Sequence, residues 1–71
     1  MLIKLINQNG DTFLLETNYI HEVGPAGEDE STNSTIMTSI RTKEGQAAFS
    51  VMDTVEEIYE QILTREKTQN K

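Results

Sequence analysis

Residues 2–16 read LIKLINQNGDTFLLE, two apolar runs separated by the turn sequence QNGD at residues 8–11. Asparagine followed by glycine between two strand-like runs is a strong hairpin signal, because both residues tolerate the positive φ that tight turns require. The stretch therefore predicts a hairpin with strands at residues 2–7 and 12–16.

The register of this hairpin stays open at the level of sequence. A two-residue loop would pair Ile6 with Phe13, whereas a three-residue loop with a bulge at Gly10 would pair Ile6 with Leu14. In both registers the two faces of the hairpin carry apolar side chains. A hairpin with one solvated face would instead alternate apolar with polar residues. Something must therefore cover the second face.

Three further strands are expected downstream. Residues 19–23 predict a short strand, which the following Gly-Pro ends because proline lacks an amide hydrogen and restricts the residue before it. Residues 24–34, GPAGEDESTNS, predict an acidic surface loop. Residues 35–42 alternate between apolar and polar side chains, and residues 46–51 form a second strand-like segment. Together they predict a second hairpin, with Lys43-Glu44-Gly45 as a three-residue loop.

The C-terminal segment predicts an amphipathic helix over about residues 55–66, followed by a frayed tail at 68–71. Thr54 and Glu57 have the spacing of a capping box, in which each side chain bonds the other residue's backbone amide. An apolar stripe at helical spacing follows, and we expect it, including the Tyr59 ring, to pack in the core. The stripe consists of Val55, Ile58, Tyr59, Ile62 and Leu63.

These elements predict an α+β fold in one domain, residues 1–71: a small antiparallel sheet of four to five strands, built from two hairpins, with the helix packed on one face. A single helix shields only one face of a sheet. The other face would then be an interface, and a homo-oligomer is the expected form, unless the sheet curls into a partial barrel. The apolar interface candidates are Ile3, Leu5, Leu14 and Met37.

The composition excludes several classes of function. Twelve acidic against six basic residues give a net charge of -6, which disfavours direct binding to nucleic acid. The chain contains no cysteine and one histidine, so zinc sites built on these residues are not expected. No run approaches the roughly 20 apolar residues that span a bilayer, and no signal peptide is recognisable, so membrane insertion is not expected and the predicted location is cytoplasmic.

Catalytic and metal-binding patterns are not recognisable either. His21 lies beside Glu22, but neighbouring strand residues point to opposite faces, so the carboxylate is poorly placed to orient the imidazole as a general base. Glu28, Asp29 and Glu30 lack the alternating oxygen ligands and central glycine of a calcium loop. We expect no enzyme activity and no cofactor. The three acids are kept as candidates for a protein interface.

Several segments resemble the FlbD/SwrD family of small flagellar and swarming-motility proteins. They are Ile3-Lys4-Leu5, Asn9-Gly10, Phe13-Leu14-Leu15, Ile20 with Val23, and the stretch SVMDTVEEI at residues 50–58. The resemblance implies a bacterial cytoplasmic accessory protein without catalytic residues that affects flagellar motor function. Our leading hypothesis is a non-enzymatic protein-interaction module of this kind, whose protein partner is unknown.

A second hypothesis rests on the acidity of the chain. A phage or mobile-element accessory protein could inhibit a host factor by presenting a negative surface. It requires the acids of the 24–34 loop to converge with Glu56, Glu57 and Glu60 on one side of the folded chain.

Overall fold

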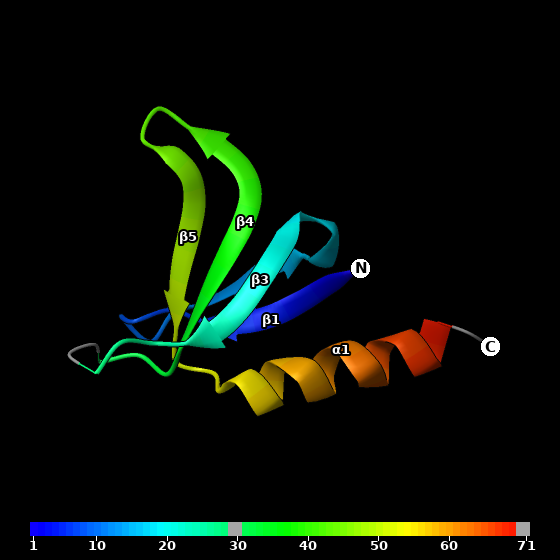
Figure 1. Ribbon diagram of the computed structural model, residues 1–71. Helices are drawn as coiled ribbons and strands as arrows, with labels where there is room; N and C mark the ends of the chain where they lie inside the picture. Colours follow the sequence, from blue (N-terminus) through cyan, green and yellow to red (C-terminus); the bar gives the residue numbers. More distant parts are fainter. Residues whose placement is uncertain (29–30, 70–71) are drawn as a thin grey trace.

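The computed structural model describes residues 1–28 and 31–69, and it shows five strands and one C-terminal α-helix (Figure 1). All strand pairs are antiparallel. The α+β class, the two hairpins and the C-terminal helix are therefore confirmed. The elements are β1 (Leu2–Ile6), β2 (Thr12–Glu16), the 3-10 turn η1 (Thr17–Tyr19), β3 (Ile20–Pro25), β4 (Ser34–Thr42), β5 (Gly45–Val51) and α1 (Val55–Gln69).

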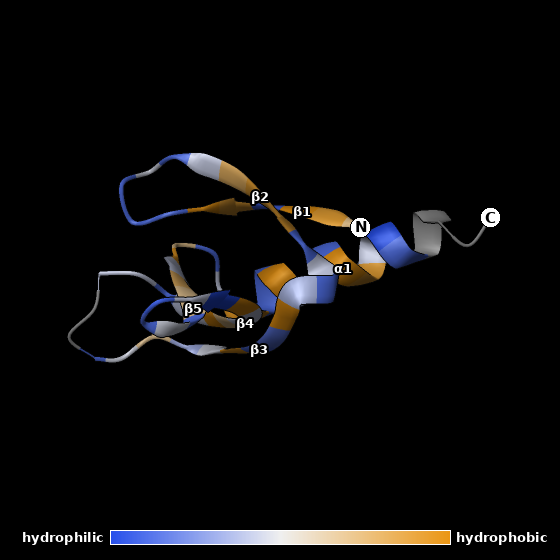
Figure 2. Ribbon diagram, turned by 90° about the horizontal axis from the view of Figure 1, so that it is seen from above, coloured by the Kyte–Doolittle hydropathy of each residue, from blue (hydrophilic) through white to orange (hydrophobic). Residues whose placement is uncertain are grey.

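The strands form two sheets, so the predicted single sheet with a helix on one face is wrong. β1 and β2 form a two-stranded sheet, and β3, β4 and β5 form a three-stranded sheet in that order. Figure 2 shows them as separate layers. The 3-10 turn η1 follows β2 directly and interrupts the extended chain before β3. Each sheet therefore covers the other's apolar face, which a single sheet curled into a partial barrel would have done by a different route.

One corner holds the two sheets together. An isolated antiparallel bridge joins Asn7 to Val51, and the Met52 amide donates to the Ile6 carbonyl at 2.7 Å. The end of β1 is thereby fixed to the end of β5, immediately before the helix.

The hydrophobic core lies between the two sheets and α1. The buried residues come from all three parts, so none of the three can bury its apolar side chains alone. The Phe13 and Phe49 rings pack across the two sheets with centroids 5.6 Å apart. The buried apolar side chains are Ile3, Leu5, Leu15, Ile36, Val51 and Ile58.

The first hairpin pairs Ile6 with Thr12 and Leu5 with Phe13, so both predicted registers are wrong. The turn begins one residue earlier than either alternative assumed, because Asn7 pairs with Asp11 and closes it. The Asn7 amide donates to the Asp11 carbonyl at 2.9 Å, and the Gly10 amide donates to the Asn7 carbonyl at 3.0 Å. Gly10 has φ 85°, the left-handed conformation expected for this glycine.

The second hairpin turns through two residues, since Thr42 pairs with Gly45 and leaves only Lys43 and Glu44 in the loop. The predicted three-residue loop is therefore wrong. The register of β4 and β5 shifts between Met37 and Arg41.

The helix begins as predicted. Glu57 Oε1 accepts from the Thr54 amide at 2.8 Å, and Thr54 Oγ1 accepts from the Glu57 amide at 3.1 Å, which confirms the capping box. α1 continues to Gln69, beyond the predicted end, so residues 68 and 69 are helical. The remainder of the predicted frayed tail, residues 70 and 71, lies outside the described residues.

Tyr59 is 59% exposed, so its predicted place in the core is wrong. Ile58 is buried and Ile62 packs against the core, and these two positions define the side of α1 that faces the sheets. Tyr59 follows Ile58 by about 100° around the helix axis, which turns its ring toward solvent.

The acidic loop is shorter than predicted and its second half is tied to the fold. β3 continues to Pro25, and Thr32 is buried. Asn33 Nδ2 donates to the Met52 carbonyl at 2.6 Å, and the Ser34 hydroxyl donates to the Asp53 carbonyl at 2.7 Å. These bonds fix the junction between β5 and α1.

Candidate interaction surface

The outer side of the first hairpin is an exposed apolar surface. Strand alternation places Leu2, Lys4 and Ile6 of β1 and Leu14 of β2 on the side away from the core, with Lys4 opposite Leu14. Leu2, Ile6 and Leu14 are 47%, 39% and 56% exposed. We call these four residues the hairpin face. Grouped exposed apolar side chains of this kind mark interaction sites more often than single ones do.

Lys4 gives the hairpin face a positive charge on an acidic protein. It is the only lysine or arginine among residues 1–34. Within the described residues its ammonium group forms no salt bridge. The hairpin face therefore combines three apolar side chains with one cation that is available to a partner.

The outer edge of β1 is closed by side chains from the helix region. The Gln61 carboxamide accepts from the Lys4 amide at 2.6 Å and donates to the Lys4 carbonyl at 2.9 Å. Asp53 Oδ1 accepts from the Ile6 amide at 2.8 Å. These three bonds replace those of a neighbouring strand, so this edge is not available for further pairing.

The outer edge of β2 is open. Backbone bonds join Asn7 to Asp11 and Thr17 to Met1, which places the odd-numbered residues of β1 in the hydrogen-bonded pairs. The backbone amides and carbonyls of Thr12, Leu14 and Glu16 therefore point away from β1. In the described part of the chain no strand pairs with this side of β2. An open edge beside an apolar face favours the addition of a partner strand.

A groove of about 290 Å³ lies between the turn of the first hairpin and β5. Three residues with carboxamide side chains line it on the hairpin side, and Phe49 is among those that line it on the β5 side. The lining residues are Asn7, Gln8, Asn9, Ala48, Phe49 and Ser50.

The apolar interface candidates differ in their exposure to solvent. Ile3 and Leu5 are fully buried between the sheets, so their assignment to an exposed face is wrong. The reason is that the two sheets cover each other's apolar faces. Leu14 lies exposed on the hairpin face, and Met37 is half-buried in β4.

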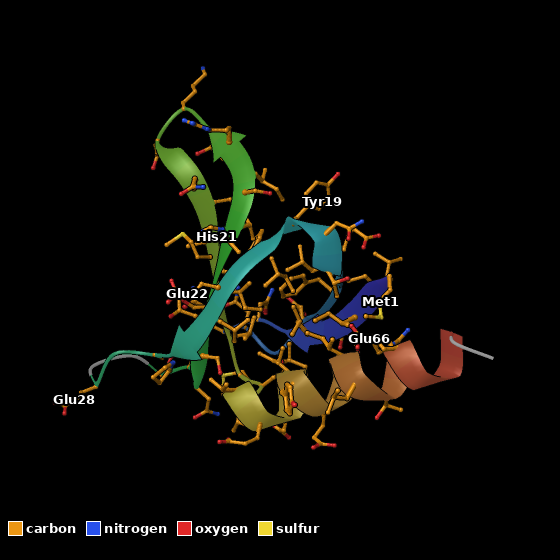
Figure 3. All side chains as sticks on the ribbon, turned by 45° about the vertical axis from the view of Figure 1, so that its right-hand side comes forward. Met1, Tyr19, His21, Glu22, Glu28 and Glu66 are labelled. Atoms are coloured by element: carbon orange, nitrogen blue, oxygen red, sulfur yellow. The ribbon has the colours of Figure 1, made fainter. Side chains whose placement is uncertain are left out.

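Of the acidic candidates, Glu28 is exposed in the loop after β3 (Figure 3), pointing away from α1. Asp29 and Glu30 lie outside the described residues. Glu56, Glu57 and Glu60 are exposed on the helix. The position of Glu28 gives no support to a single convergent acidic surface.

Sequence reasoning missed Leu2 and Ile6 as parts of the surface. The signal was present in the pattern LIKLI, where residues 2 and 6 must share one side of the strand and residues 3 and 5 the other. Both sides are apolar, so the sequence did not show which would be buried.

His21 and Glu22 are both exposed on β3 (Figure 3). The register of β3 against β4 shifts between Ile20 and Glu22, so His21 lies in a bulge. Among the described residues no carboxylate forms an ion pair with His21, and no group of three or more histidine, cysteine or acidic side chains is arranged to hold a metal ion.

Glu16, at the end of β2, accepts a hydrogen bond from the Met1 ammonium at 2.5 Å and one from the Asn18 amide at 3.3 Å. The bond from the ammonium group is the main cause that lowers the pKa of the Glu16 carboxyl below 4.5, and the Asn18 amide contributes in the same direction. The carboxylate thus joins the start of β1 to the turn after β2.

A lowered pKa in the folded state makes the contribution of Glu16 to stability dependent on pH. The contribution is present above the unfolded-state pKa, near 4.5, and is lost as the pH falls through the lower folded-state value. We expect Glu16→Gln to be less stable than the parent at neutral pH and to approach it in acid. Urea unfolding at neutral and acidic pH measures this, with Glu22→Gln as the control for loss of one negative charge. A stability difference between Glu16→Gln and the parent that does not change with pH would contradict this prediction.

Within residues 1–28 and 31–69, no helix combines the length and hydrophobicity that crossing a bilayer requires. No protein-family model, curated protein or solved structure matches this chain.

Proposed function

We propose that this chain is a non-enzymatic protein-interaction module that docks through the hairpin face and the open edge of β2. The observation that carries the proposal is the exposure of Leu2, Ile6 and Leu14 on one side of the first hairpin, next to strand backbone groups that pair with no strand of residues 1–28 and 31–69.

The docking surface is held in place before any partner arrives. Gln61 and Asp53 fix β1 to the helix region, and Ile3 and Leu5 anchor the same strand in the core. A partner therefore binds without first ordering the hairpin, which lowers the entropic cost of association.

The affinity has three sources. Covering the three half-exposed apolar side chains stabilises a complex by about 1 kcal/mol each. A partner strand on β2 would add backbone hydrogen bonds, and an acidic group on the partner would pair with Lys4. These contributions suit a partner that is extended, apolar and carries a carboxylate. Self-association through the β2 edge stays a prediction.

The resemblance to the FlbD/SwrD family supports a role in flagellar motility for this module, in the bacterial cytoplasm. An accessory role of this kind needs binding and no catalysis. The arrangement of an exposed apolar face on a rigid hairpin fits it.

The test compares three strains of the source bacterium: a gene deletion, Leu14→Lys and Tyr59→Lys. We expect the deletion and Leu14→Lys to reduce swimming and swarming without changing the number of flagella. Tyr59→Lys, which places the same charge at another exposed apolar position, should leave motility unchanged. Circular dichroism of the purified variants confirms that both remain folded.

The outcomes separate the two parts of the proposal. Normal motility of the deletion strain would remove the motility role. A motility defect in the deletion strain together with normal motility in Leu14→Lys would remove the hairpin face as the docking surface.

A further inference from the structure

We propose that Asn9 is a site of spontaneous backbone-assisted deamidation, which changes the turn of the first hairpin and the wall of the groove beside it. The proposal concerns the covalent chemistry of the turn and does not depend on the proposed function.

The turn places Asn9 in the setting that this reaction needs. Asn9 is exposed, and its carboxamide forms no hydrogen bond with any described residue. The next residue is Gly10, and a Cβ built on it would have no atom within 4 Å, so the space beside its Cα is open. Because glycine has no side chain, that nitrogen can approach the Asn9 carboxamide carbon without steric hindrance.

The other described asparagines are held or shielded. Asn33 Nδ2 donates to the Met52 carbonyl at 2.6 Å, and the residue that follows, Ser34, is buried in β4. Asn7 Oδ1 accepts two backbone amides. Asn18 precedes Tyr19, which, unlike glycine, carries a large side chain next to the amide nitrogen that would have to attack. Sequence and structure together thus distinguish Asn9 from the three others.

The reaction needs only water. The Gly10 amide nitrogen loses its proton to solvent and attacks Cγ of Asn9, and the Cγ–Nδ2 bond breaks. Nδ2 leaves as ammonia after taking up a proton from water, and a succinimide remains. Water then opens the succinimide. Cleavage of the bond from the glycine nitrogen to Cγ gives aspartate, and cleavage of its bond to the main-chain carbonyl carbon gives isoaspartate.

The closed turn opposes this attack. The Gly10 amide donates to the Asn7 carbonyl at 3.0 Å, which engages the nucleophilic nitrogen. The Asn7 side chain adds a clamp, because its Oδ1 accepts from the Asn9 amide at 2.9 Å and from the Asp11 amide at 3.0 Å. The reaction therefore proceeds from a transiently opened turn, and Asn7 sets how often the turn opens.

The product alters the surface next to β5. Either product adds a carboxylate beside Asp11, on a chain whose net charge is already -6. Isoaspartate also adds a methylene group to the backbone of a turn that Gly10 closes in the left-handed conformation. Since Asn9 lines the groove, the groove of an aged protein differs in charge and shape from that of a newly made one.

The experiment incubates the purified chain in mildly alkaline buffer at physiological temperature and follows the mass of each asparagine-containing peptide. We expect Asn9 to convert fastest, with aspartyl and isoaspartyl products resolved by chromatography, and Asn9→Gln to abolish the signal. Asn7→Ala removes the two clamp bonds and should accelerate the conversion about tenfold. Urea-unfolded parent protein gives the rate of Asn9 conversion without any turn. The effect of the turn on this rate can therefore be measured even if Asn7→Ala folds poorly.

Faster conversion at Asn18 or Asn33 than at Asn9 in the folded chain would overturn the assignment. Equal rates in folded parent, Asn7→Ala and urea-unfolded protein would overturn the role of the clamp.

Discussion

Replacing Ile58 with alanine is expected to lower the free energy of unfolding by about 3 kcal/mol. Ile58 is 1% exposed, and it is the one fully buried helix side chain among the described residues. It packs with residues of both sheets, so its removal leaves a cavity at the point where the three layers meet. A domain of this size has a small stability margin, and a large fraction of the molecules should unfold at physiological temperature.

Urea unfolding followed by circular dichroism measures the effect, and Tyr59→Ala is the matched control. Both substitutions put alanine at adjacent helix positions, but the Tyr59 ring is exposed. The control should therefore change stability by less than about 0.5 kcal/mol. Equal losses in the two variants would show that α1 does not dock on the sheets through Ile58.

Replacing Asp53 with alanine is expected to destabilise the fold by about 2 kcal/mol, the usual value for loss of a hydrogen bond to a charged group. Asp53 Oδ1 accepts from the Ile6 amide at 2.8 Å, one of three bonds that close the outer edge of β1. The residue also lies between β5 and α1, at the corner where the two sheets join. Its loss exposes the end of β1 to solvent.

Hydrogen exchange at the Ile6 amide gives a local measurement alongside urea unfolding. Exchange should be faster in Asp53→Ala, while Asp53→Asn, which keeps an oxygen acceptor, should protect this amide more than alanine does. Unchanged exchange at Ile6 in Asp53→Ala would contradict the edge-closing role of this carboxylate.

The elements that the sequence predicted correctly depend on contacts between residues close in the chain. Asn9-Gly10 predicts a turn because the glycine adopts positive φ at low cost. The capping box of Thr54 and Glu57 needs only residues three apart. Both features appear in the structure as expected.

The hairpin register could not be predicted, because a shift of one residue preserves the turn signal and the apolar content of both faces. The register is set at Asn7, whose side chain and backbone close the turn. The resulting face exposes Leu2, Ile6 and Leu14, of which sequence reasoning had identified only Leu14.

The sequence by itself determined where the chain turns, where the helix starts and that both sides of the first hairpin are apolar. Only the tertiary structure decided that two sheets cover each other and that Ile3 and Leu5 are buried. It also decided that Gln61 closes the β1 edge, while no strand in the described part of the chain pairs with the outer edge of β2. The physical reason is the separation along the sequence of the residues that interact. Turns and caps are fixed by hydrogen bonds within a few residues, whereas burial and edge closure depend on which distant segments meet, such as Lys4 and Gln61, 57 positions apart.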